Sequence, residues 1–399
     1  MWLRRSTALV ALPALAAFAL IVPWGRRGWE LDWDWGMRTA ATGMVFLAPI
    51  IAGLAAYDMS HRFRASLFDI AGGSRRGPRS VMFPALATWA WAMTACAAGW
   101  AWVAVSVTFR SGMGPRDGWV YPESATAMLA AAAIGGFLGA VIRGVLAAPT
   151  AAIAVYCVGF FTEPYGVRGV LSVVSSSGTL LGLERTPERA VQAIVINGLL
   201  ALVFLVWTVW RSSPFPQWRL ATTGAGALAI IALAVAFVMP PSDSEYRASS
   251  EPNVCVGQAP QVCGPEGARR LLLPVQADLQ GGRTRLAGTG LVWPATYVVA
   301  RVDKVFQVPP GAAVLELTPD DVRDGHYRVQ RLAAALSQPR LCAAFFDDKA
   351  VQPYVEASVR LRDWLTKALS STKAPGPAPE SIKRDFALLS KCQQALAAP

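Results

Sequence analysis

The side chains that could form a catalytic centre lie in the last third of the chain. Cys342, His326 and Asp347 could together supply a nucleophile, a base and a group that orients the base. Such a centre needs a free thiol, whereas the four cysteines of this part can pair with one another. Asp320-Asp321 and Asp347-Asp348 could bind calcium, but surface acid pairs are usually only solvated. We therefore predict that the chain is not an enzyme.

Motifs for metal or nucleotide chemistry are also missing from the sequence. It has no HExxH, which removes the common metalloprotease class, and no GxxxxGK[ST], so the chain cannot be its own ATPase by that route. Zinc is the alternative to disulfides for the four cysteines. However, they form no CxxC pair, and His326 is the only histidine after residue 240. We predict no cofactor and no bound metal.

The cysteines after residue 240 predict a disulfide-bonded domain in an oxidising compartment. Four cysteines allow three connectivities, of which we favour Cys255–Cys263, closing a short loop, together with Cys342–Cys392. The two other cysteines lie in apolar runs and are interpreted as small buried hydrophobic residues.

Composition divides the chain into a membrane part and a water-soluble part. Charged residues make up 16% of the 399 residues, against about 25% in a typical soluble protein. Residues 1–240 carry +8 of the net charge of +11. We predict a transmembrane domain at 1–240 and an extracytoplasmic α+β domain at 241–399. The basic residues cluster between apolar runs, as membrane topology requires, so we exclude nucleic-acid binding.

Within residues 241–399 we expect five regular elements and a linker. Strands are expected at Ala295–Val302 and Ala312–Leu317, and helices at Tyr327–Leu336, Val351–Leu369 and Ser381–Leu396. The linker that leaves the membrane is residues 240–244.

Seven apolar runs predict transmembrane helices. A span needs about 20 apolar residues, because the hydrocarbon layer is about 30 Å thick. Six runs qualify and a shorter seventh, Pro149–Phe161, could span if it is tilted or begins at Ala147-Ala148. The first run could be a signal peptide but lacks a convincing cleavage site, which favours an uncleaved anchor. The six are Thr7–Pro23, Met37–Tyr57, Val81–Phe109, Ser124–Leu146, Val191–Trp210 and Leu220–Met239.

Arginines set the predicted orientation of these spans. Five of them lie between Asp58 and Ser80, which places that loop in the cytoplasm. An odd number of spans then puts residues 241–399 outside the cell membrane. Tryptophans near span ends are interpreted as interfacial anchors; they are Trp24, Trp29, Trp33, Trp35, Trp119, Trp210 and Trp218.

The predicted span interiors contain no ionisable residue. Arg38 lies near an outer end, where a long side chain can reach water, and Asn197 is expected to bond to a neighbouring helix. Proton- or sodium-coupled transport therefore lacks its usual carboxylates. A membrane machine of this kind would take its energy from a separate motor.

An amphipathic segment, Asp58–Ile70, could bind such a motor on the cytoplasmic face. Apolar residues recur in it at helical spacing, and basic residues lie mostly off that stripe. The alternative is an interfacial helix bound to anionic lipid headgroups. The predicted ATPase-docking residues are Met59, Arg62, Phe63, Arg64, Leu67 and Phe68.

Residues 163–189 are too polar to span and too apolar for a simple loop, which indicates a re-entrant hairpin shielded by protein. Gly135 and Gly139 form a GxxxG that permits close helix contact.

Together, these features resemble the permease subunits of exporter-type (type 2) ABC transporters. The likeness covers about residues 1–211 and rests on a six-span core, on the segment Asp58–Ser80 and on the hairpin Glu163–Arg189. The chain also resembles actinobacterial permease-like proteins with a Cys-bearing extracytoplasmic tail, through Val254–Glu266 and Leu361–Leu365. A seventh span and the tail depart from a plain exporter permease.

The resemblance implies a homodimer or heterodimer with two separate ATP-binding subunits, embedded in membrane lipids. We predict the permease subunit of an ATP-driven exporter. The alternative is a non-transporting, membrane-anchored sensor or assembly protein that acts through the outer domain.

Overall fold

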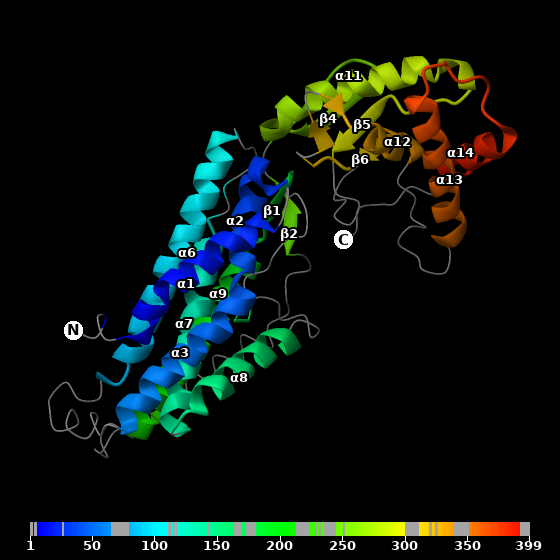
Figure 1. Cartoon of the computed structure of the whole chain (residues 1–399). Helices are drawn as coiled ribbons and strands as arrows, with labels where there is room; N and C mark the ends of the chain where they lie inside the picture. The colour runs from blue at the N-terminus through cyan, green and yellow to red at the C-terminus, as the bar shows by residue number, and fades with distance from the viewer. Residues whose placement is uncertain are drawn as a thin grey trace. The chain divides into compact units, whose positions relative to one another are not determined.

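The chain is described by a computed structural model (Figure 1). The described residues are 3, 6–25, 28–64, 80–110, 114, 116, 118–142, 144–162, 170–171, 181–212, 223–224, 226–227, 230, 234, 245–249, 252–299, 311–318, 321–323, 326–338 and 351–391.

The chain divides into two compact units. The first comprises Met1–Arg110, Arg116–Ser177 and Arg185–Glu245, and the second comprises Ser111–Pro115, Gly178–Glu184 and Tyr246–Pro399. The main division therefore falls between Glu245 and Tyr246, a few residues after the predicted boundary at residue 240.

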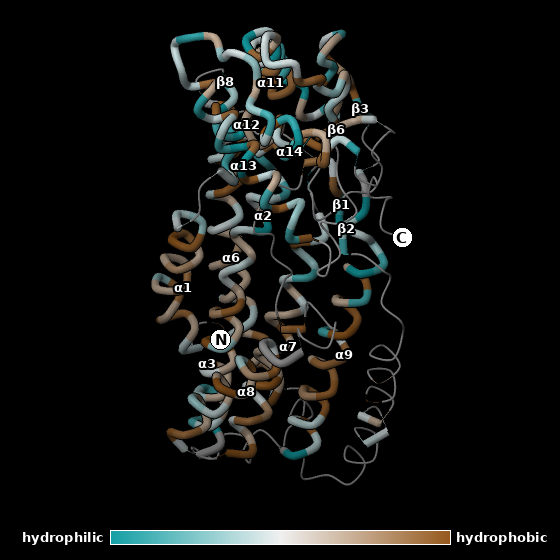
Figure 2. The backbone as a smooth tube through the Cα atoms, turned by 90° about the vertical axis from the view of Figure 1, so that its right-hand side faces the viewer, coloured by the Kyte–Doolittle hydropathy of each residue, from teal (hydrophilic) through white to brown (hydrophobic). Residues whose placement is uncertain are grey.

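The first unit is a bundle of apolar helices, drawn largely in brown in Figure 2. Among the described residues, five stretches are long and apolar enough to cross a membrane, which fits a multi-pass membrane protein: Thr7–Trp24, Trp33–Arg62, Phe83–Phe109, Val120–Val141 and Pro187–Arg211. The helices are α1 (Thr7–Trp24), α2 (Trp33–Thr42), α3 (Met44–Arg64), α6 (Phe83–Phe109), α7 (Val120–Val141), α8 (Ala147–Thr162) and α9 (Pro187–Ser212).

These helices correspond to six of the seven predicted spans. Helix α8, which corresponds to the short seventh run, begins at Ala147, the earlier start that the sequence allowed. Residues 220–239 lie mostly outside the described residues, so the predicted count of seven stays a prediction. The second predicted span is divided at Gly43, where α2 ends and α3 begins.

Small residues bring α3 and α7 into close contact, as the GxxxG pattern predicted. A Cβ atom added at Gly135 would overlap the carbonyl oxygen of Ala52, and one added at Gly139 would overlap that of Ala56. The two glycines therefore face two alanines of α3 at the same four-residue spacing. Backbones can approach this closely only where neither helix carries a larger side chain.

Two described residues of the predicted hairpin Glu163–Arg189, Val170 and Leu171, lie inside the bundle, whereas Leu183–Arg185 form strand β1 and Pro187 begins α9. Val170 and Leu171 are buried in the same apolar core as the helices. Asn197, for which we expect a hydrogen bond to a neighbouring helix, accepts through Oδ1 from the backbone N–H of Leu171 at 2.9 Å. Leu171 also has a φ of 56°, a left-handed conformation that costs a leucine about 1–3 kcal/mol and persists only where its surroundings hold it.

The second unit is built around a four-stranded sheet in the order β3-β4-β5-β6. Strands β3 (Asn253–Val256) and β4 (Gln261–Pro265) are antiparallel, whereas β4, β5 (Thr296–Val299) and β6 (Ala313–Leu315) are parallel. Helix α11 (Arg269–Arg285) connects β4 to β5, because parallel neighbours need a crossover. Cys255 pairs with Cys263 in the β3–β4 register, and the two form the predicted disulfide.

Three further helices follow the sheet: α12 (Val329–Ser337), α13 (Val351–Ser370) and α14 (Glu380–Lys391). All three begin and end within a few residues of the prediction, except that α14 is described only to Lys391. Arg360 of α13 binds Asp385 of α14 through two hydrogen bonds of 2.9 Å, which raises the pKa of the Arg360 guanidinium. Two small strand pairs complete the fold: β1 (Leu183–Arg185) with β2 (Tyr246–Ala248), and β7 (Val322–Arg323) with β8 (His326–Tyr327).

Candidate functional site: a buried ionic cluster

A short polar helix brings the first two charges of the cluster into the apolar unit. Asp32 caps the N-terminus of α2, since its side chain accepts from the backbone N–H of Trp35 at 3.1 Å. Asp34 and Arg38 then lie one turn apart on α2, with Arg38 Nε 3.5 Å from Asp34 Oδ1. This i,i+4 spacing places both side chains on one face of the helix.

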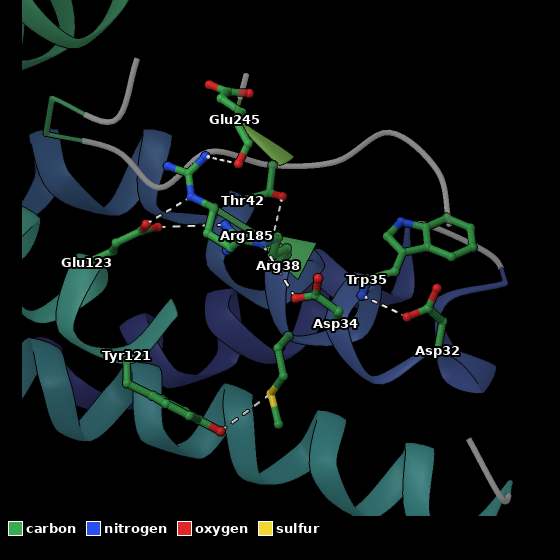
Figure 3. Close-up of polar contacts among 10 residues, drawn as sticks. Asp32, Asp34, Trp35, Arg38, Thr42, Tyr121, Glu123, Arg185 and Glu245 are labelled. Atoms are coloured by element: carbon green, nitrogen blue, oxygen red, sulfur yellow. Dashed lines mark hydrogen bonds and ion pairs between the residues drawn. The ribbon is translucent and has the colours of Figure 1, made fainter. Parts of the chain in front are cut away.

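Glu123 and Arg185 join these two residues from other parts of the chain (Figure 3). Glu123, in the first turn of α7, lies with Oε2 3.6 Å from Arg38 Nη1. Its other oxygen, Oε1, accepts from Nε of Arg185 at 3.2 Å. Arg185, the last residue of β1, also donates through Nη1 to the backbone oxygen of Glu245 at 3.3 Å. The chain of contacts therefore links α2, α7, β1 and the residue that precedes β2.

The four charged side chains are almost completely enclosed. Arg38 is 0% exposed, Asp34 and Glu123 are 1% exposed and Arg185 is 4% exposed. The two arginines balance the two carboxylates, so the cluster carries no formal net charge. Burial of an ion is expensive unless a partner of opposite charge offsets the lost hydration, and Glu123 offsets it for both arginines.

The cluster corrects one sequence-based expectation. We expected no ionisable residue within the spans and expected Arg38 to reach water; Arg38 is instead fully buried beside Asp34 and Glu123. The i,i+4 spacing of Asp34 and Arg38 was a usable signal for an ion pair. No sequence signal connected them to Glu123 and Arg185.

Two tryptophans near the cluster also differ from the interfacial role expected for them. Trp29 and Trp35 are buried, and the Nε1 atom of Trp29 donates to the backbone oxygen of Pro23 at 2.8 Å. Trp24 does remain 72% exposed, as an interfacial residue would. The buried indoles instead help to enclose α2: a Cβ at Gly36 would lie 3.3 Å from the ring of Trp29.

Another buried carboxylate, Asp58 of α3, holds the beginning of α1. It accepts from the backbone N–H of Thr7 at 3.1 Å and from the hydroxyl of Ser6 at 2.9 Å, and the hydroxyl of Thr7 also bonds to it. Ser6 lies 3.4 Å from the hydroxyl oxygen of Thr88 on α6. A carboxylate at a helix N-terminus satisfies otherwise free N–H groups and is favoured by the helix dipole.

The predicted ATPase-docking residues are divided between buried and undescribed positions. Met59 is completely buried with Val81 and Ala140, and Arg62 is 7% exposed. Phe63 and Arg64 form the last residues of α3, whose helix thus continues into the predicted segment. Leu67 and Phe68 lie outside the described residues, as do Cys342 and Cys392 of the second predicted disulfide.

Comparison with protein-family models, curated proteins and solved structures gives no match for this chain.

Proposed function

We propose that the chain is the permease subunit of an ATP-driven ABC-type exporter that works with a separate ATPase subunit. The observation that carries the proposal is the burial of Val170 and Leu171, which lie between α8 and α9 in the chain, in the apolar core of the bundle. The backbone N–H of Leu171 is bonded inside an apolar core by the side chain of Asn197. A non-helical backbone can enter the membrane region only where protein satisfies its polar groups, and a re-entrant element at this place is what the permease layout requires.

The ionic cluster suits a protein that must change conformation. It ties α2 and α7 of the bundle to Glu245, the residue directly before the outer domain begins. A movement of α7 would therefore act, through Glu123, on Arg38 of α2 and on Arg185, which holds this backbone. In the proposed transporter the cluster transmits a movement of α7 to the backbone at Glu245.

The motor is expected to bind beyond the end of α3. Met59 and Arg62 are buried, so they would support the docking segment from within rather than contact the ATPase directly. Leu67 and Phe68 are then the predicted contact residues, and the assembly would contain two permease and two ATPase subunits in the membrane.

Reconstitution with a candidate ATPase, identified by its Walker motifs in a neighbouring open reading frame, tests this proposal. The permease should raise the rate of ATP hydrolysis well above that of the ATPase alone. Replacement of Leu67 and Phe68 by Asp should abolish the stimulation. The matched control places Asp at Leu273 and Val292, two exposed apolar residues of the outer domain, and should leave stimulation unchanged. An intact complex without stimulated hydrolysis would favour the sensor or assembly protein instead.

A further inference from the structure

An apolar cavity of about 550 Å³ lies in the helical unit beside α7 and α9. Phe137 of α7 and Trp207 and Trp210 of α9 form its walls, together with Ile230. Arg211, in the last turn of α9, is the one charged residue among its described lining residues. Ligand sites have volumes of about 300–1,000 Å³ and are typically apolar with a few polar groups, so the cavity is of suitable size and character.

The aromatic side of the cavity is held in place by ring packing. The ring centroids of Phe137 and Phe204 lie 5.4 Å apart, those of Phe137 and Trp207 lie 5.6 Å apart, and those of Phe204 and Trp207 lie 5.8 Å apart. These separations are typical of favourable aromatic pairs. The wall is therefore formed before any ligand enters.

The lining residues are open to a ligand from the surroundings. Trp207 is 36% exposed, Ile230 is 42% exposed and Trp210 is 44% exposed. In a chain with this many membrane-length helices, the surrounding medium of such a surface is lipid. An acyl chain would fill the space between these side chains. The polar end of the lipid would then lie beside the guanidinium of Arg211.

We propose that this cavity binds one acyl chain of an anionic phospholipid, whose headgroup phosphate pairs with Arg211. Charge complementarity favours an anionic headgroup, because phosphatidylcholine carries, beside the same phosphate, a choline cation that the guanidinium repels, whereas phosphatidylglycerol carries none; we expect about a fivefold difference in occupancy. Arginine also matches phosphate geometry better than a point charge does. The binding site does not depend on the proposed transport function and would exist equally in a sensor or assembly protein.

Photolabelling of the full-length chain in lipid nanodiscs tests the proposal. The probes are phosphatidylglycerol and phosphatidylcholine that carry the same diazirine-labelled acyl chain, and labelled peptides are mapped by mass spectrometry. We expect labelling of the α7 and α9 peptides that line the cavity, about fivefold stronger for phosphatidylglycerol. Unlabelled phosphatidylglycerol should compete for these positions better than unlabelled phosphatidylcholine.

Two variants locate the ligand and two matched variants control for them. Ile230→Trp fills the cavity and should remove most of the labelling there, whereas Ile153→Trp, at an exposed position of α8, should not. Arg211→Gln should reduce the ratio of phosphatidylglycerol labelling to phosphatidylcholine labelling to about one. Arg110→Gln, at the end of α6, should leave this ratio unchanged.

Equal labelling by both probes in the wild-type chain, or labelling that is spread evenly over exposed helices, would overturn the proposal. The proposal would also be overturned if the cavity peptides are not labelled and the chain forms a dimer that Ile230→Trp disrupts. In that case a second copy of the chain, and not a lipid, would occupy the cavity. The wild-type competition experiment decides the question even if a variant fails to fold.

Discussion

At the scale of single residues, the bundle uses a few buried charges that share partners. Glu123 contacts both Arg38 and Arg185, so two buried arginines share one carboxylate. Loss of one member of a buried ionic group leaves an uncompensated charge, whereas removal of a complete pair can be almost neutral. The cluster should therefore be far more sensitive to single than to paired substitutions.

A double-mutant cycle tests this dependence. Glu123→Leu alone should lower the stability of the full-length chain by about 3–5 kcal/mol, since Arg38 and Arg185 would both lose the carboxylate that they share. Arg38→Met alone should also destabilise. The double variant keeps one arginine and one carboxylate. Its loss of stability should be smaller than the sum of the losses of the two single variants. Thermal unfolding in detergent measures the three values, and strictly additive losses would show that the residues do not form a coupled cluster.

Residue types predicted this cluster only in part. Spacing placed Asp34 and Arg38 on one helical face, but Glu123 lies just before the predicted span Ser124–Leu146 and was counted outside it. Arg185 lies more than 60 residues from Glu123 along the chain, and no local periodicity carries such a contact. The pairing of Cys255 with Cys263 was predictable because a short loop joins them and β3 and β4 form a hairpin.

At the scale of elements, small residues set how closely α3 and α7 approach. The overlap of an added Cβ at Gly135 involves the backbone of Ala52, which cannot rotate away as a side chain can. Overpacking of this kind typically costs about 1–3 kcal/mol. A helix must move to relieve it.

Alanine substitutions compare a packed glycine with an open one. Gly135→Ala should lower the melting temperature of the purified chain, because α3 and α7 must separate. Gly198→Ala lies on α9 with nothing within 4 Å of the added Cβ, and it should leave the melting temperature unchanged or raise it slightly through better helix propensity. Equal effects of the two substitutions would contradict close packing at Gly135.

Long apolar helices were the most predictable elements, since their composition alone identifies them. Helix α11 was missed because charged residues, Pro274 and two glycines interrupt its apolar stripe, so the helix depends on packing against the sheet. Strands β3 and β4 were missed as well, because strands this short show little alternation of apolar and polar residues. Neighbouring strands and helices, rather than local preference, decide these elements.

At the scale of the whole molecule, the functional proposal depends on which side of the membrane each end of the bundle faces. Arginines between Asp58 and Ser80 predict a cytoplasmic loop, and an odd number of spans predicts an exterior tail. The disulfide between Cys255 and Cys263 agrees with an oxidising environment for that tail. An ATPase can reach the docking segment only with this orientation.

Paired reporter fusions after Pro399 measure the orientation most directly. Alkaline phosphatase, which needs an oxidising compartment, should be active there, and green fluorescent protein exported in unfolded form should stay dark. Fusions of both reporters after Gly73, in the predicted cytoplasmic loop, are the control and should behave in the opposite way. A fluorescent protein and an inactive phosphatase after Pro399 would place the tail in the cytoplasm and contradict the proposed permease.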